Sequence, residues 1–133
     1  MSASNGDYLR KVAAAMGSTG VALGAIGAHA LKDVLTKRGT LASYHTATIY
    51  QLFHSAAILA LSSYAASHDD DKSGTSSNTY LKTAGNLMGV GTLMFSGSIY
   101  CLSVGIGPKA LLGPTTPLGG LLMIGGWVVL GLG

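Results

Sequence analysis

Long apolar runs separated by short polar segments dominate the chain. The first run, residues 12–31, has no formally charged side chain, and three further runs cover about residues 45–66, 83–106 and 117–133. About 20 apolar residues, each adding about 1.5 Å, are enough to cross a bilayer as a helix. The pattern therefore predicts an all-α integral membrane protein with four transmembrane spans, forming a single domain over residues 1–133.

The polar segments between these runs differ in character. The basic segment KDVLTKRGTLASYH has apolar residues at intervals that favour a short interfacial helix after the first span. The acidic segment SHDDDKSGTSSNT, residues 67–79, is rich in Ser, Thr and Gly and predicts a solvated loop. Glycine and proline in GPKALLGPTTP predict an interruption before a last span that begins at Pro117. We therefore expect a four-helix bundle with short loops.

Composition agrees with a membrane protein and excludes a nucleic-acid-binding one. The chain is 48% hydrophobic and only 10% charged, whereas soluble domains carry roughly 25% charged residues. Its net charge of +3 comes from bases scattered at the ends of the apolar runs, a distribution typical of membrane-flanking residues. The first run is too long for a signal peptide, and we expect it to remain in the mature protein. Lys and Arg are balanced between the two predicted sides, so they do not predict the orientation.

Small residues form stripes along two of the predicted helices. At 100° per residue, the glycines of the first span fall within an arc of about 80°. Such stripes let helix backbones approach closely in lipid. The third span has a similar face, in which glycines are followed by Thr92, Ser96, Tyr100 and Ser103. The predicted helix-packing positions are Gly17, Gly20, Gly24, Gly27, Gly85 and Gly89. We expect the first stripe to receive a helix of another protein.

Polar side chains gather on one side of the second span. A polar group in hydrocarbon is costly unless it faces inward and finds a partner. We therefore predict that the second-span residues of this set point toward the third span, and that His54 pairs with Ser96. The predicted buried polar residues are Tyr50, Gln51, His54, Ser96 and Tyr100.

Two histidines in neighbouring spans raise the question of a bound haem or metal. Helical rise places His29 about 4 to 5 Å and His54 about 13 Å inside the same membrane boundary. Because these depths differ, we predict no metal and no cofactor, and we interpret both histidines as structural in preference to proton-handling. His45 and His68 are expected at span edges. Cys101, the single cysteine, lies in an apolar run and is predicted to be a small core residue.

Four segments together resemble the domain-of-unknown-function 423 family, which includes the transmembrane protein 256-like proteins. They are GAIGAHAL, YQLFHSAAILAL, AGNLMGVGTLMFSGSIYCLSV and LGPTTPLGGLLMIGGWVVL. The resemblance covers about residues 10–132 and implies a four-span inner-membrane protein, bacterial or mitochondrial, without an assigned reaction. The acidic second loop departs from the short link typical of that family. The family motif maps onto Gly27, His29, Tyr50, Gln51, His54, Ser96, Gly97, Tyr100, Pro117, Gly119 and Trp127.

Three classes of function compete at this point. The first is an accessory or structural subunit of a larger respiratory or photosynthetic membrane complex, whose partners are the lipid bilayer and other membrane subunits. The second is a small-solute or proton transporter that uses Gln51, His54 and Ser96. An enzyme is the least favoured, because no span contains an acidic residue and no nucleophile has a neighbouring base. The expected location is the mitochondrial inner membrane, with the thylakoid or bacterial inner membrane as alternatives.

Overall fold

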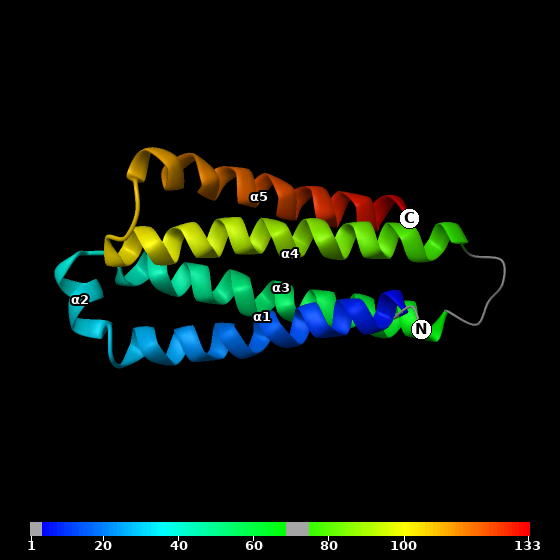
Figure 1. Cartoon of the computed structure of the whole chain (residues 1–133), viewed down its shortest axis with the longest axis horizontal. Coiled ribbons are helices and arrows are strands. Elements are labelled where there is room, and N and C mark those ends of the chain that lie inside the picture. The colour runs from blue at the N-terminus through cyan, green and yellow to red at the C-terminus, as the bar shows by residue number, and fades with distance from the viewer. Residues whose placement is uncertain (1–3, 69–74) are drawn as a thin grey trace.

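Helices make up almost all of the described chain. The computed structural model describes residues 4–68 and 75–133. Its elements are α1 (Asn5–Ala28), α2 (Lys32–Lys37), α3 (Leu41–Ser67), α4 (Thr75–Val104) and α5 (Lys109–Leu132). The described residues contain no strand, which confirms the all-α prediction. The start of α1 and the end of α5 lie at one end of the molecule, and α2 lies at the other (Figure 1).

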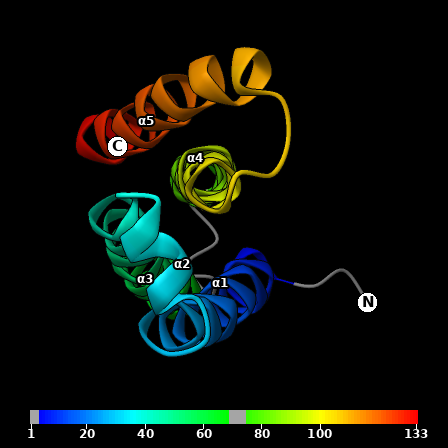
Figure 2. The ribbon, with the colours of Figure 1, turned by 90° about the vertical axis from the view of Figure 1, so that its left-hand side faces the viewer.

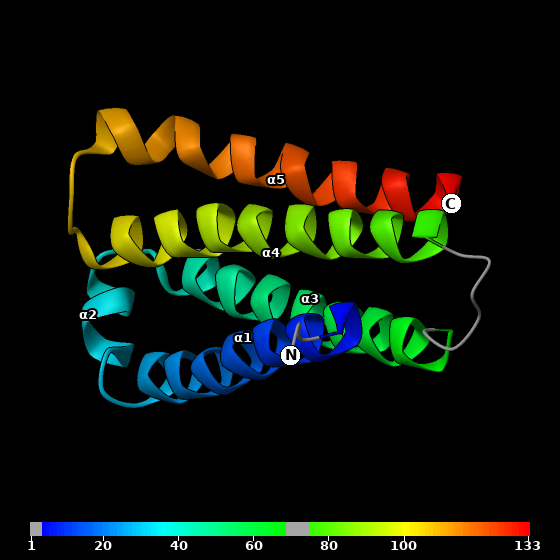
Figure 3. The same ribbon diagram turned by 45° about the vertical axis from the view of Figure 1, so that its right-hand side comes forward.

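Three of the long helices are apolar enough to cross a membrane. They are α1, α4 from Thr79 onward, and α5. Helix α3 is just as long, but Gln51, His54 and several Ser and Thr residues lower its apolar content. The six-residue helix α2 occupies the segment in which a short helix was expected, and it lies across the ends of its neighbours (Figure 3).

Local capping explains why α1 begins before the apolar run predicted for it. Helix α1 starts at Asn5 instead of Val12 because the Ser4 side chain accepts a hydrogen bond from the Asp7 backbone N–H at 3.2 Å. Asp7 in the first turn also pairs with Arg10 at 2.8 Å. Helix α4 begins at Thr75, inside the segment predicted as a loop. The acidic residues of that segment, 69–71, lie outside the described residues.

The prediction that the last helix begins at Pro117 is wrong. Helix α5 begins at Lys109 and contains both Pro114 and Pro117. The turn that precedes it is made by Gly105 and Gly107, whose φ values of 78° and 86° favour glycine. Each proline removes one intrahelical N–H donor and its ring crowds the carbonyl four residues earlier, so the helical path of α5 depends on its extensive packing against α4.

The long helices pack in the order α1, α3, α4, α5. Helices α1 and α3 form one closely packed pair, α4 and α5 form the other, and α3 contacts α4. No residue of α1 approaches α5, and the view down the long axis shows this open succession (Figure 2). The chain is all-helical as predicted, but this open succession is not clearly the four-helix bundle with short loops that the sequence predicts.

A compact core lies between α1, α3 and α4, while much of the apolar surface points outward. Leu9, Ile58 and Met88 are fully buried in this core. Large apolar side chains are nevertheless exposed on every long helix, and Leu93 is 75% exposed. An apolar outer surface of this extent is expected where a protein contacts lipid or other proteins.

Candidate functional site

The glycine stripe of α1 packs inside the chain. A Cβ added at Gly20 would lie 2.8 Å from Leu52 Cδ2, and a Cβ at Gly27 would run into the Tyr44 ring. Gly17 and Gly24 also face side chains of α3. All four predicted positions therefore lie at a helix contact, but the expectation that this stripe receives a helix of another protein is wrong.

The predicted glycines of α4 face α1. Leu9 packs over Gly85, where an added Cβ would come within 2.5 Å of Leu9 Cδ2, and a Cβ at Gly89 would lie 3.6 Å from Val12. A tighter glycine contact joins the other side of α4 to α5. There a Cβ at Gly119 would overlap the backbone N of Phe95 and lie 2.6 Å from Gly91 O. Gly91 was not among the helix-packing positions predicted from the sequence.

Gln51 links three helices through its side-chain amide. Its Nε2 donates to Met16 O and to Thr19 Oγ1 of α1, both at 2.9 Å. Its Oε1 accepts from Tyr100 OH of α4 at 2.8 Å. Gln51 is only 8% exposed, so its side chain lies inside the helix assembly and its polar atoms are paired.

The predicted pair between His54 and Ser96 is wrong. Ser96 Oγ donates to Ala47 O at 2.7 Å, whereas His54 Nε2 accepts from Trp127 Nε1 of α5 at 3.3 Å. Ala47 precedes His54 by seven residues, which is about 10 Å along the helix. His54 also lies on the side of α3 that faces α5. The prediction compared only the depths of the two residues along their helices, and depth does not give the direction of a side chain.

Tyr50 lies at an edge instead of inside the helix assembly. Its ring packs against Phe95 of α4, with ring centroids 4.7 Å apart, as the prediction requires. The residue is nevertheless 42% exposed. Within the described part of the chain, its hydroxyl has no hydrogen-bond partner.

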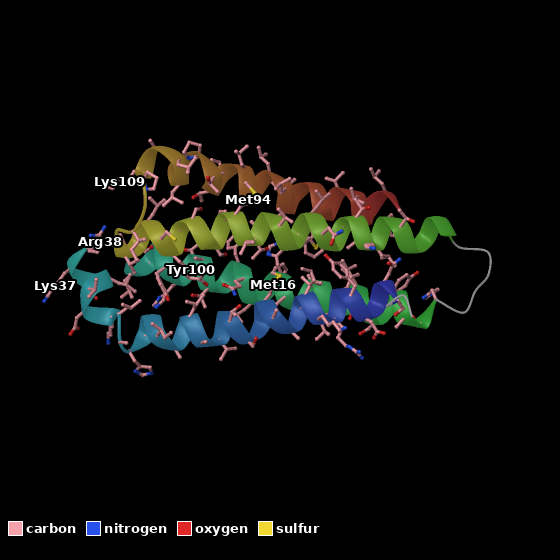
Figure 4. The ribbon with its side chains drawn as sticks, in the orientation of Figure 1. Met16, Lys37, Arg38, Met94, Tyr100 and Lys109 are labelled. Atoms are coloured by element: carbon pink, nitrogen blue, oxygen red, sulfur yellow. The ribbon has the colours of Figure 1, made fainter. Side chains whose placement is uncertain are left out.

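One groove runs lengthwise between α1 and α4, and we call it the α1–α4 groove. Its wider part, about 400 Å³, has walls that include Ala15, Thr19 and Gly97, with Gln51 and Ser96 below them. A shallower hollow of about 280 Å³ continues it toward the chain termini and shares Ala15, Met16 and Leu93 with it. Figure 4 shows Met16 and Tyr100 between α4 and the α1–α3 pair.

A second cavity, which we call the aromatic pocket, opens between α3 and α5. It has a volume of about 420 Å³. Helices α3 and α5 are joined here by side chains alone, with Phe95 of α4 between them. The lining residues are Ile49, Tyr50, Phe53, His54, Phe95, Gly120, Met123, Ile124 and Trp127.

The remaining candidate residues do not join either cavity. His29 is exposed at the end of α1, and His45 and His68 are exposed near helix ends. Cys101 is half-buried, so it is not the core residue that its apolar surroundings predicted. No group of three or more His, Cys, Asp or Glu side chains among the described residues is arranged to hold a metal ion. The expectation of no metal stays a prediction.

A basic residue that sequence reasoning did not single out joins α2 to α4. Arg38 Nε donates to Ser103 O at 2.9 Å, and Thr40 Oγ1 donates to the same oxygen at 2.8 Å. The guanidinium lies against Gly105, which leaves no room for a Cβ there. Figure 4 places Arg38 with Lys37 and Lys109 at the α2 end of the molecule. A cation beside the carboxyl end of a helix is electrostatically favourable.

Long apolar helices, an apolar exterior and inward-facing polar groups define a small helical membrane protein. The chain belongs to the DUF423 family of proteins of unknown function, whose model matches residues 23–120. This membership confirms the resemblance drawn from the sequence.

Related membrane proteins occur in yeast and in bacteria. A UPF0382 membrane protein of Schizosaccharomyces pombe is 38% identical over 124 residues, which cover 90% of this chain and 94% of that protein. The UPF0382 membrane protein YwdK of Bacillus subtilis is 38% identical over 110 residues, which cover 83% of this chain and 81% of YwdK. A UPF0382 membrane protein of Haemophilus influenzae is 35% identical over 113 residues, with 85% and 82% covered. No solved structure matches the chain.

Proposed function

We propose that this chain is a non-catalytic accessory subunit of a larger membrane complex. In this proposal α3 also crosses the membrane, giving four spans. Its 27 residues extend about 40 Å, and it packs between α1 and α4, which both qualify as spans. Gln51 and His54, in the central part of α3, are turned inward and are 8% and 4% exposed, whereas His45 is exposed near its first turn. We assign the complex to the mitochondrial inner membrane, and the bacterial relatives fit a bacterial inner membrane equally well.

The observation that carries this proposal is the α1–α4 groove. Its walls are smooth because they contain Ala15 and Gly97, and a Cβ added at Gly97 would meet nothing within 4 Å. Close contact along small residues is the main source of helix association in lipid. The polar groups below the groove are already paired within the chain. The groove therefore suits a partner helix that is recognised by shape.

The transporter alternative has less support. It requires Gln51, His54 and Ser96 to line one path across the membrane. His54 lines the aromatic pocket, whereas Gln51 and Ser96 line the α1–α4 groove. The side chains that would carry a solute or proton therefore belong to two separate cavities.

The substitution Gly97→Leu tests the proposal, because it fills the groove without a clash inside the chain. Gly113→Leu is the matched control, since an added Cβ there also meets nothing within 4 Å but Gly113 lies outside the groove. Both variants should insert into native membranes and unfold at the wild-type temperature. After extraction in mild detergent, Gly97→Leu should be recovered mainly free, and Gly113→Leu should migrate with its complex. Migration of the wild-type chain as a free monomer would refute the proposal.

A further inference from the structure

We propose that the aromatic pocket binds a lipid-soluble molecule whose planar ring carries carbonyl or hydroxyl oxygens, as in the quinones. This site is separate from the α1–α4 groove, so the inference does not depend on the accessory role, but it rests on the proposed crossing of the membrane by α3. It rests on the shape of the pocket, on the aromatic rings that line it, and on polar groups at the depth of the hydrocarbon.

The pocket has the size and access that such a ligand requires. Its volume of about 420 Å³ lies within the range of about 300 to 1,000 Å³ typical of small-molecule sites. Two lining residues at its opening, Ile49 and Ile124, are 63% and 60% exposed. In a membrane these apolar side chains face lipid, so a ligand reaches the pocket through the bilayer.

Each of the three helices that form the pocket, α3, α4 and α5, contributes at least one aromatic ring to it. Tyr50 and Phe95 have centroids 4.7 Å apart, and Phe53 lies 6.0 Å from Trp127. The His54 ring meets Trp127 edge to face at 6.2 Å. Aromatic pairs prefer offset-stacked or edge-to-face contacts at about 4.5 to 7 Å. A flat ring entering the pocket gains such contacts, whereas an acyl chain gains only dispersion.

The unpaired hydroxyl of Tyr50 favours a ligand ring that carries oxygen atoms over a purely apolar ring. Tyr50 precedes His54 by four residues, so in a spanning α3 it lies about 7 Å inside the membrane boundary from which the depth of His54 was counted. Its hydroxyl has no partner among the described residues, although an unpaired polar group in hydrocarbon is costly. A ligand carbonyl would accept from this hydroxyl. A phospholipid acyl chain offers no acceptor at this depth.

His54 and Trp127 supply a second polar position in the same pocket. His54 Nδ1 lies 2.9 Å from Tyr50 O, so this nitrogen is the donor and Nε2 is the acceptor that faces Trp127. The Trp127–His54 bond is long, at 3.3 Å. The indole N–H is therefore able to donate instead to a ligand oxygen, while Nε2 accepts from a ligand hydroxyl. Both the oxidised and the reduced form of a quinone have a complementary group.

Ligand binding is measured by the fluorescence of Trp127, because it is the single tryptophan of the chain. We would titrate the purified protein in lipid nanodiscs with a decyl-substituted benzoquinone and follow tryptophan fluorescence. We expect saturable quenching by the benzoquinone. A decyl ester that lacks the ring should neither quench the tryptophan fluorescence nor displace the benzoquinone.

Two glycines of α5 form a matched pair of variants. An added Cβ at Gly120 would lie 3.8 Å from Phe95, and one at Gly125 would lie 3.9 Å from Leu87. Only Gly120 lines the pocket. We expect Gly120→Leu to abolish saturable quenching and Gly125→Leu to retain it. Tyr50→Phe keeps the ring and removes the unpaired hydroxyl, so it should weaken binding about fivefold without a loss of stability.

Quenching that rises linearly with quinone, equally in wild type and in all three variants, would overturn the inference, because it reports only partition into lipid. Full displacement of the quinone by the decyl ester would overturn it in favour of an acyl chain in the pocket. Unchanged affinity in Tyr50→Phe would refute the role assigned to the hydroxyl and with it the preference for an oxygen-bearing ring.

Discussion

The same residue, glycine, builds the contact between α1 and α3 and the contact between α4 and α5, but in different ways. Along α1 the glycines make room for side chains, as Gly27 does for the Tyr44 ring and Gly20 for Leu52. Between α4 and α5 they bring backbone against backbone, and Gly119 lies over the main chain of Phe95 and Gly91. A side chain can rotate away from an added methyl group, whereas a helix backbone can only move as a whole. The two contacts should therefore respond differently to the same substitution.

The largest effect is expected at the backbone contact. Gly119→Ala would place a Cβ on main-chain atoms of α4 and force the two helices apart, with a loss of about 3 kcal/mol in unfolding free energy or a failure to fold. Thermal unfolding in detergent, followed by circular dichroism, measures this loss. Gly131→Ala in the same helix is the control, because an added Cβ there meets nothing within 4 Å. Equal stability of the two variants would show that α4 and α5 are not in backbone contact.

A smaller loss is expected where a glycine accommodates a side chain. Gly27→Ala would displace the Tyr44 ring, which is 1% exposed and whose hydroxyl donates to Leu23 O at 2.8 Å. We expect a loss of about 2 kcal/mol by the same unfolding measurement. Because the cost comes from the clash, Gly27→Ala should cost less when combined with Tyr44→Ala than it does alone. Strictly additive losses would contradict this account.

The hydrogen bonds of Gln51 should contribute less than either glycine contact. Gln51→Leu removes two donor bonds to α1 and one acceptor bond from α4, and we expect a loss of about 1 kcal/mol. Tyr100→Phe removes the bond between Tyr100 and Gln51 together with the longer contact, 3.4 Å, from the same hydroxyl to Thr48 Oγ1. A double-mutant cycle in unfolding free energy should show coupling between Gln51 and Tyr100, because they share this bond. Absence of coupling would mean that the bond contributes nothing to stability.

The smallest effect is expected to have the opposite sign. At Gly17 an added Cβ would lie 3.5 Å from Ser55 Oγ, which is an ordinary contact. Since alanine favours a helix over glycine by roughly 0.5 to 1 kcal/mol, Gly17→Ala should raise the unfolding temperature slightly. A lower unfolding temperature would show that α1 and α3 lie closer at this position than at ordinary van der Waals separation.

The periodicity of the sequence predicted which faces pack but not which helix each face meets. The α1 glycines share one arc of the helix, and that arc is a helix contact. A stripe of small residues does not specify which helix it contacts, because close approach suits any helix with a matching shape. Its partner proved to be α3 of the same chain. The partner became apparent only from tertiary contacts such as Tyr44 against Gly27.

Helix ends and polar pairs were harder to predict for two further physical reasons. Hydropathy marks the part of a helix that suits lipid, so it missed the first turns of α1, where Asp7 and Arg10 are polar but helical. Depth along a helix also does not fix the direction in which a side chain points. His54 and Ser96 were matched by depth, but they face α5 and α3 respectively. The inward orientation of Gln51 was easier to anticipate, because an amide group in hydrocarbon is costly unless it turns inward and finds partners.

The bond between Arg38 and Ser103 has a consequence for the order of assembly during biosynthesis. Ser103 is translated 65 residues after Arg38, so the bond that joins α2 to α4 forms only once α4 has been made, whereas the contacts of α2 with α1 and α3 do not need α4. Until then Gln51 also lacks Tyr100, its partner on α4. A nascent chain that stops after α3 therefore lacks the bond of Arg38 to Ser103 and one of the three hydrogen bonds of the Gln51 side chain, and both form when α4 joins the other helices.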